Sequence, residues 1–472
     1  MKKLKVKFAT TAIALMLSII LVISGLNKIA INSKSAIAQT TDDNILQLSK
    51  LRELEENVGN EMDEGKIISS DNKILWEKKF NGYEDTFSLI GTYRDGTQLS
   101  NNTITYKYKD TLLPDINKYN FKDGIQSMFN STGNIMLSLN HKINSMIYNY
   151  MKKNKANKAS ALLVDINTGA TIASVSLPSI KPTTSVQISS LQEGSLVNKN
   201  LSDLCFPGST EKISTTVVLS ELIGNEIDNL NYICNGKFIL KNGGAVTCST
   251  SKGRKDISSA IGTSCNSFFA NTTQNILDNN KKKTIAYYKK IGYAFGNVEY
   301  TNLDKLSRVK SLSEYNGDGS LNNVWSTIGE QSVKVNAYDM TNLVSAILNG
   351  GEYTEPYIVQ NINYKNGKKI VHKPKHKKIL SKKAARIVLE KWKEGFDKYY
   401  SLNSKVLIAK TGTAEIETTD KNGKRIKKDS SLLLGCMKIK EKKVAFFINI
   451  EDYKSSKIKA SDVAEYIAGN IG

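Results

Sequence analysis

A chain of 472 residues, of which 40% are hydrophobic and six are proline, can bury a large core, and this composition excludes a largely disordered protein. The formal net charge of +21 favours anionic partners, but the basic residues are scattered without an aromatic-basic motif, so no nucleic-acid binding is predicted. The five cysteines lack zinc spacing and only three histidines exist, so we predict no cofactor, no metal site and no histidine-dependent triad. The cysteines are expected to be small buried side chains, although a Cys234–Cys248 disulfide stays open.

The first segment begins with lysines and continues into an uncharged apolar stretch at 8–27, which is long enough to span a bilayer. The positive-inside tendency keeps residues 1–7 in the cytoplasm and exports the chain that follows the stretch. A cleaved signal peptide is the alternative, because Ala36-Ile37-Ala38 has the form of a cleavage site, but the apolar stretch ends well before it. We therefore predict a single-pass protein of the cell membrane with its functional part outside the cytoplasm.

Residues 28–154 are expected to form a stalk and a small strand-rich region. Residues 39–64 carry leucines spaced like one helix face, and 65–135 mix short apolar runs with Asn, Gly and Asp. Apolar residues at helical spacing then predict a helix over 136–154. We predict no chemistry in this part of the chain.

Residues 155–472 are predicted to form one domain of mixed α/β (α+β) class. Its strands are expected near its two ends, at 161–164, 171–175, 406–409, 432–434 and 444–448. The stretch from 209 to 346 is expected to be largely helical, and the Lys-rich segment 368–378 to be a loop. Strands at both ends with helices between them imply an antiparallel five-stranded sheet flanked by helices.

A nucleophile is predicted where a turn meets a helix. Pro207 and Gly208 form the turn before Ser209, and apolar residues at helical spacing follow. Ser209 and Lys212 then project from one helix face, about 5 to 6 Å apart at Cβ, so a neutral amine could take the hydroxyl proton. Burial and a second nearby cation would lower the pKa of Lys212 and favour that neutral amine. SxxK alone is weak evidence, because the same spacing recurs at Ser70-Lys73 and elsewhere as ordinary surface residues.

Two further segments follow Ser209 in order and make the pattern specific. Ser264 and Asn266 lie at a helix junction, and Lys410-Thr411-Gly412 ends an apolar strand. Serine acyl-transfer enzymes need a hydroxyl that relays a proton, an amide that holds the substrate backbone, and a cation with a hydroxyl for a carboxylate. Ser264, Asn266 and the pair Lys410 and Thr411 supply these groups. Gly412 is expected to let a substrate peptide pair along the strand edge.

These motifs resemble those of the penicillin-binding proteins and the class A β-lactamases, which share the SxxK, SDN and KTG set. The wider match is to the class B, transpeptidase-only penicillin-binding proteins. The segments that carry it are Asp165–Gly169 (DxxTG), Phe206–Lys212 (PGSTFK), Ser264–Phe269 (SCNxxF), Gly329–Gly351 (GQG to NGG), Lys410–Glu415 (KTGTAE) and, upstream of these, Gly65–Leu75.

The resemblance implies a peptidoglycan D,D-transpeptidase that cross-links stem peptides through a serine acyl-enzyme and is inhibited by β-lactams. Stem peptides or a lipid-linked precursor would be its substrates, and a glycan polymerase a partner. The oxyanion hole would be the backbone N–H groups of Ser209 and Thr413. The chain departs from the family pattern where Glu211 replaces Phe, Glu330-Gln331 replaces Gln-Gly and Lys252-Gly253 replaces His-Gly, and the segment after Lys410 lacks the usual His-Ala-Trp.

Other functions share parts of this pattern. A D,D-carboxypeptidase differs only in passing the acyl group to water, and a serine β-lactamase needs a base that activates that water. Glu299 is the apparent base, but its neighbours reverse the Leu and Asn of the ExxLN pattern, so we predict a long-lived acyl-enzyme. A non-catalytic scaffold for wall synthesis is the remaining alternative.

Overall fold

The computed structural model describes residues 64–77, 82–91, 93–94, 97–98, 100–113, 132–182, 191–248, 252–419 and 425–471. The predicted cytoplasmic tail, the apolar stretch and the stalk as far as residue 63 lie outside these residues. Among the residues that are described, no helix has both the length and the apolar character to cross a bilayer.

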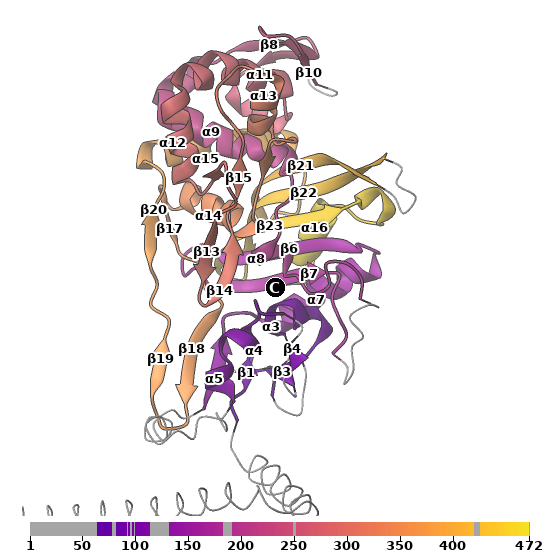
Figure 1. Cartoon of the computed structure of the whole chain (residues 1–472). Coiled ribbons are helices and arrows are strands. Elements are labelled where there is room, and N and C mark those ends of the chain that lie inside the picture. Colours follow the sequence, from indigo (N-terminus) through magenta and orange to yellow (C-terminus); the bar gives the residue numbers. More distant parts are fainter. Residues whose placement is uncertain are drawn as a thin grey trace, which may run out of the picture. The chain divides into compact units, whose positions relative to one another are not determined.

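A five-stranded antiparallel sheet lies at the centre of the described chain, with the strand order β21-β22-β23-β6-β7 (Figure 1). Its strands are β6 (Lys158–Asp165), β7 (Thr171–Leu177), β21 (Val406–Thr419), β22 (Arg425–Ile439) and β23 (Lys442–Glu451). Each strand contains one of the five apolar runs that the sequence singles out. The strands extend beyond those runs because backbone pairing continues into polar residues, as at Glu415 and Asp429.

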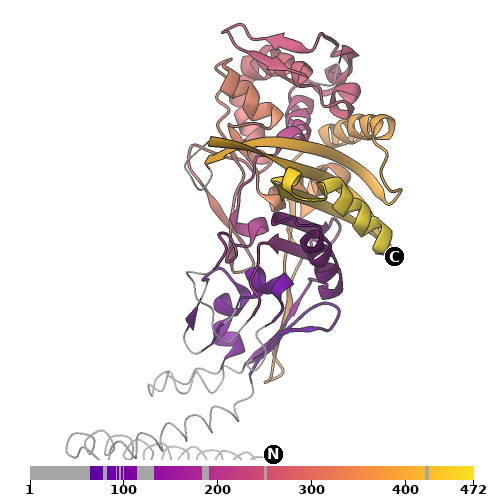
Figure 2. The same ribbon diagram turned by 90° about the vertical axis from the view of Figure 1, so that its right-hand side faces the viewer.

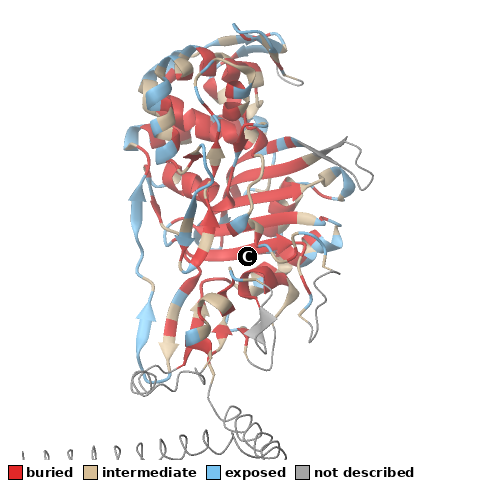
Figure 3. Ribbon diagram, viewed as in Figure 1, coloured by how far each residue is buried: buried red, intermediate tan, exposed pale blue. Residues whose placement is uncertain are grey.

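Helices cover both faces of this sheet (Figure 3). The helices α7 (His141–Lys153) and α16 (Ala460–Asn470) pack on one face, and Figure 2 shows α16 in yellow against the long strands. On the other face, α14 (Ala337–Leu348) contacts three of the strands and α15 (Lys382–Tyr399) contacts β21. The middle strand β23 is therefore buried on both faces from Val444 to Ile450, which accounts for its continuous apolar run.

The segment between β7 and β21 holds most of the helices, and α9 (Glu211–Ile223) is buried along its length as far as Ser220. Besides α9, α14 and α15, its α-helices of six or more residues are α10 (Ile257–Gly262), α11 (Asn266–Thr272), α12 (Lys281–Lys290) and α13 (Leu321–Ile328). Short strand pairs interrupt the predicted helical stretch, namely β8 (Tyr232–Cys234) with β11 (Gly253–Lys255), β9 (Lys237–Ile239) with β10 (Ala245–Thr247), and β13 (Tyr300–Leu303) with β14 (Leu306–Val309). β12 (Ala294–Phe295), β15 (Leu312–Ser313) and β16 (Val333–Lys334) form a further small sheet.

A second five-stranded sheet, β19-β18-β5-β1-β2, joins residues near the start of the described chain to a hairpin from its middle (Figure 1). Its strands are β1 (Ile67–Ile68), β2 (Ile74–Trp76), β5 (Gly133–Leu137), β18 (Val359–Tyr364) and β19 (Lys369–Val371). The expectation of a loop at 368–378 is wrong, because β19 pairs there with β18, and β20 (His376–Lys378) pairs with β17 (Glu352–Thr354). Both strands are short and exposed to solvent, and the lysines in and around them give the segment the composition of a loop.

Candidate active site

A turn places Ser209 at the start of α9, against the edge strand β21. Ser209 lies in the 3₁₀ turn Gly208–Thr210, and the N–H of Gly208 donates to the carbonyl of Gly329 at 2.9 Å. Gly208 has φ +51, and a Cβ there would lie 2.5 Å from the carbonyl oxygen of Thr413. Only glycine fits this position, so the Pro-Gly turn fixes the approach of Ser209 to β21.

Lys212 contacts the predicted nucleophile directly. Its Nζ lies 2.7 Å from Ser209 Oγ and 2.8 Å from Asn266 Oδ1, and the residue is fully buried. Burial and, after it, the positive charge of Lys410 lower the pKa of Lys212 to about 7, and the carboxyl of Glu330 opposes the shift. A substantial fraction of the amine is therefore neutral near pH 7 and able to accept a proton.

Ser264 enters the site from the loop that precedes α11, and Asn266 is the first residue of that helix. Ser264 adopts a left-handed backbone conformation, with φ +57, and its Oγ accepts a hydrogen bond from Lys410 Nζ at 3.2 Å. The Asn266 amide bridges two segments, since its Oδ1 accepts from Lys212 and its Nδ2 donates to the carbonyl of Thr247 at 3.1 Å. The predicted second motif thus lies between the two lysines.

The edge strand β21 supplies the third group of residues. Lys410 is fully buried, and its Nζ also donates to the carbonyl of Thr411 at 2.9 Å and to the hydroxyl of Tyr400 at 3.3 Å. Thr411 and Thr413 carry exposed side chains, whereas Gly412 between them is buried. Among the described residues, β21 is hydrogen-bonded in this sheet to β22 alone, so it forms the edge of the sheet.

Gly412 packs against the Ser209 turn, a contact that the sequence does not indicate, and its predicted part in substrate binding stays a prediction. A Cβ at this position would lie 2.6 Å from the carbonyl oxygen of Pro207 and 3.0 Å from Thr210 Cγ2. The glycine is required because the chain's own 3₁₀ turn packs against β21 at this point. Because Gly412 has no side chain, the Ser209 turn can pack closely against the strand.

Tyr400 is a site residue that the sequence motifs do not indicate. Its hydroxyl accepts from the N–H of Thr411 at 3.2 Å and lies 3.0 Å from Thr411 Oγ1. Burial acts to raise the pKa of this phenol, but Lys410 and the hydrogen bonds from Thr411 lower it overall. Tyr400 follows the last turn of α15, so only the packing of that helix brings it to the strand.

The two acidic departures from the family pattern face different surroundings. Glu211 is fully buried and accepts a hydrogen bond from Tyr293 at 2.5 Å, and burial raises the pKa of its carboxyl to about 8. Burial raises the pKa of Glu330 to about 7, against the effect of the Lys212 ammonium and of a hydrogen bond from the backbone N–H of Glu415. The carboxyl of Glu330 therefore interacts electrostatically with Lys212, which the sequence motifs do not indicate.

Two residues that belong to the competing sequence patterns, Asp71 and Glu299, make structural contacts. Asp71 of the literal Ser70-Asp71-Asn72 accepts hydrogen bonds from the N–H groups of His141 and Lys142, so it caps α7. Glu299 is half exposed and forms an ion pair with Lys310 at 2.7 Å.

Comparisons with known proteins agree with this geometry. A model of the family described as the penicillin binding protein transpeptidase domain matches residues 159–471. Peptidoglycan D,D-transpeptidase FtsI of Escherichia coli (strain K12) is 34% identical over 83 residues, so the match spans 17% of this chain and 14% of that protein.

Solved structures extend the similarity over most of the chain. Penicillin-binding protein A from M. tuberculosis, as a ceftriaxone acyl-enzyme complex, has a TM-score of 0.69 at 15% identity, with 87% of this chain and 98% of that chain covered. The D,D-transpeptidase domain of a peptidoglycan glycosyltransferase from Eggerthella lenta has a TM-score of 0.67 at 21% identity, with 86% and 98% covered. At these identities the structural likeness establishes the fold.

Proposed function

Because the chain belongs to the family of penicillin-binding protein transpeptidase domains, we propose that it is a peptidoglycan D,D-transpeptidase with Ser209 as its nucleophile. One observation carries this proposal above the others. The Nζ atom of Lys212, whose pKa is lowered to about 7, lies 2.7 Å from Ser209 Oγ. An unprotonated amine at that distance is the base that a serine hydroxyl needs in order to attack a carbonyl carbon.

The acylation step uses Ser209 and Lys212 for the attack and Ser264 for the release of the leaving amine. Lys212 takes the proton of Ser209 while the hydroxyl oxygen bonds to a carbonyl carbon of the donor stem peptide. The peptide bond to the terminal residue breaks, and Ser264 passes a proton to the departing amine. The backbone N–H groups of Ser209 and Thr413 are assigned to the developing oxyanion, because the Ser209 turn packs directly on Thr413.

The second half of the reaction replaces the lost residue by a new amine. The acceptor amine of another stem peptide attacks the ester carbon and gives up a proton to Lys212, the bond to Ser209 Oγ breaks, and Lys212 returns that proton to the hydroxyl. Substrate recognition is assigned to β21. The donor backbone pairs with the edge strand, Asn266 holds a backbone amide, and Lys410 with Thr411 and Thr413 binds the terminal carboxylate.

The cellular setting belongs to the proposal as well. The apolar stretch 8–27 would anchor the chain in the cell membrane and leave the catalytic domain outside the cytoplasm. There the stem peptides of peptidoglycan, or of a lipid-linked precursor, are within reach, and a membrane-bound glycan polymerase would be a natural partner. β-Lactams would act as inhibitors by acylating Ser209.

Labelling with a fluorescent penicillin tests this function. The full chain, purified in detergent, should incorporate about one label per molecule, and the modified peptide should contain Ser209. Prior incubation with an unlabelled β-lactam should prevent incorporation. A label on another residue, or no label on protein with a cooperative thermal transition, would refute the proposal.

A carboxypeptidase, which passes the acyl group to water, is the second candidate, and Glu330 is the observation that favours it. A carboxyl with a pKa of about 7 beside Lys212 could hold and deprotonate a water. Release of the terminal residue from a donor stem peptide in the absence of an acceptor amine, slowed in Glu330→Gln, would favour the carboxypeptidase. We expect the penicilloyl adduct to survive for many minutes, and release within seconds would instead favour a serine β-lactamase.

A further inference from the structure

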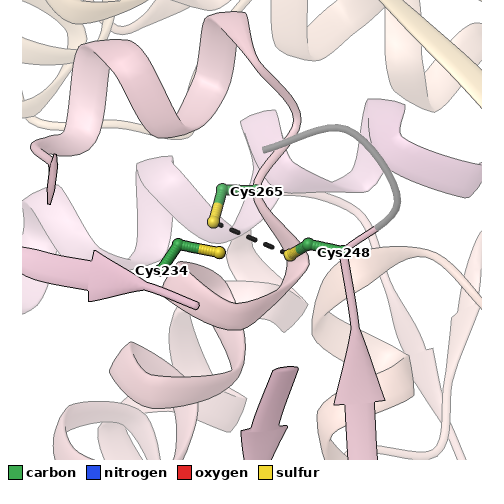
Figure 4. Close-up of side chains that lie close together, drawn as sticks. All are labelled: Cys234, Cys248 and Cys265. Atoms are coloured by element: carbon green, nitrogen blue, oxygen red, sulfur yellow. Dashed lines mark hydrogen bonds between the residues drawn. The ribbon is translucent and has the colours of Figure 1, made fainter. Parts of the chain in front are cut away.

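Three cysteines from separate segments meet beside the catalytic cluster (Figure 4). Cys234 ends β8, Cys248 follows β10, and Cys265 precedes α11. Their sulfur atoms all lie within 4.8 Å of one another, and Cys248 Sγ is 3.8 Å from Cys265 Sγ. All five cysteines of the chain are thiols, so the Cys234–Cys248 disulfide that the sequence leaves open is not formed.

We propose that Cys234, Cys248 and Cys265 form a binding site for a thiophilic divalent cation, with Zn²⁺ as the ion that fits best. A tetrahedral zinc ion with Zn–S bonds of about 2.3 Å holds its sulfur ligands about 3.8 Å apart. The Cys248–Cys265 separation already has this value, and small side-chain rotations would bring Cys234 to it. Binding releases the thiol protons to solvent and leaves three thiolates around the metal.

Polar groups around the sulfur atoms suit thiolate ligands. The N–H of Ser267 lies 3.1 Å from Cys248 Sγ, and the N–H of Phe268 lies 3.4 Å from Cys265 Sγ. Such donors stabilise the negative charge that sulfur acquires on a metal and fix the direction of its lone pairs. The hydroxyl of Ser267, 3.3 Å from Cys248 Sγ, is close enough to serve as or orient the fourth ligand.

The three cysteines of this site differ in their exposure to solvent. Cys234 and Cys265 are almost completely buried, whereas Cys248 is partly exposed. A cation can therefore enter at Cys248, and a water molecule can complete a tetrahedral shell there. The site is absent from the sequence pattern because no two of these cysteines are closer than 14 residues, and the third belongs to the Ser264–Asn266 loop.

The position of the cluster links it to the catalytic residues. Cys265 lies between Ser264 and Asn266, and Cys248 follows Thr247, whose carbonyl accepts from Asn266 Nδ2. A metal joining Cys248 to Cys265 would therefore clamp the β9–β10 hairpin to the loop that holds Asn266. If the proposed function is right, Asn266 and Lys212 are positioned more firmly when the metal is bound.

Metal content of the full, untagged chain tests this site without any acyl donor. Protein purified in detergent, reduced, stripped with a chelator and returned to a chelator-free buffer is exposed to equimolar zinc and desalted. We expect about one zinc per wild-type chain and loss of at least nine-tenths of it in Cys234→Ser and Cys248→Ser. Cys436→Ser, a buried cysteine on β22 outside the cluster, is the matched control and should keep its zinc.

Cobalt titration of the wild-type chain keeps the test independent of how the variants fold. Co²⁺ should produce sulfur-to-cobalt charge-transfer absorption that zinc abolishes by displacement. Three outcomes would overturn the site, namely no such absorption, equal zinc in the cluster variants and in Cys436→Ser, or a disulfide within the cluster in protein isolated without reductant. Penicillin labelling is scored separately, so failure of the metal site and failure of the proposed function are distinguished.

Discussion

The two walls of the site each position a buried lysine, but they do so by different means. On the helical wall, which comprises Ser209, Lys212, Ser264 and Asn266, the contact between Lys212 and Ser209 spans three residues of one continuous turn and helix. On the strand wall, formed by Tyr400 and residues 410–413 of β21, Lys410 reaches Ser264 across 146 residues of chain.

This difference separates proton transfer from substrate recognition. A local turn of helix fixes the Cβ spacing of a serine and a lysine whatever the rest of the fold does. A strand edge instead offers backbone groups and a charge to a ligand, and it acquires its place only when the sheet and the helices pack together. We therefore expect changes on the helical wall to slow or abolish acylation of every donor, and changes on the strand wall to alter which ligands are used.

The largest effect should come from Ser209→Ala. Labelling by penicillin should disappear because the nucleophilic oxygen is gone, while the thermal transition should move little because the residue contributes little apolar burial. Ser264→Ala is the comparison on the same wall and should retain slow labelling, since it removes a proton relay but leaves the nucleophile. Persistent labelling of Ser209→Ala would move the nucleophile elsewhere in the chain.

The next-largest effects should distinguish the role of Lys212 from that of Lys410. Lys212→Ala should slow acylation about 10²- to 10⁴-fold for every acyl donor, because the proton acceptor is lost. Lys410→Ala should slow donors that carry a carboxylate by about tenfold to a hundredfold and spare donors without one. The rates are best compared near pH 9, where Lys212 is neutral with or without the charge of Lys410.

Equal losses for carboxylate-bearing and carboxylate-free donors in Lys410→Ala would contradict the division between the walls. Lys398→Ala provides a matched control. Lys398 lies in the last turn of α15, two residues from Tyr400, and the substitution removes a positive charge that makes no direct contact with Lys410. It should leave both classes of donor within about twofold of wild type.

The pH dependence of acylation should report the state of Lys212. Because its pKa is about 7 and the neutral amine is the base, the acylation rate should rise as the pH rises through about 7. The carboxyl of Glu330 holds that pKa up, so Glu330→Gln should shift the rising limb to lower pH by on the order of one unit. A shift to higher pH would show that Glu330 acts in another way.

The smallest effect on acylation should come from Glu211, the neighbour of Lys212 that points to the core. Its folded pKa of about 8 exceeds the ordinary 4.5, so its contribution to stability is complete below about pH 4.5 and is lost as the pH rises to about 8. As the pH rises from about 4.5 to about 8, Glu211→Gln should therefore gain stability relative to wild type, by on the order of a few kcal/mol. Denaturant unfolding at pH 5 and pH 8 measures the difference, and a constant difference would contradict the neutral carboxyl.

Local sequence was sufficient for much of this molecule. The five apolar runs predict the five strands because each alternates or continues in the way a buried strand must, and β23 shows the continuous form. The spacing of Ser209 and Lys212 sets their proximity because helix geometry is the same in every context. The ordered motifs with Ser264, Asn266 and Lys410 indicate the remaining members because they resemble a known set.

Only the tertiary structure decided the rest. The pairing of β18 with β5 and the approach of Tyr400 to Thr411 depend on packing between segments that no spacing rule connects. The role of Gly412 is visible only when the Pro207 turn lies against β21, since the reason for a missing side chain is the atom that would collide with it. The cysteine cluster is the clearest case, because metal-ligating geometry is a property of distances in space, and three segments supply it together.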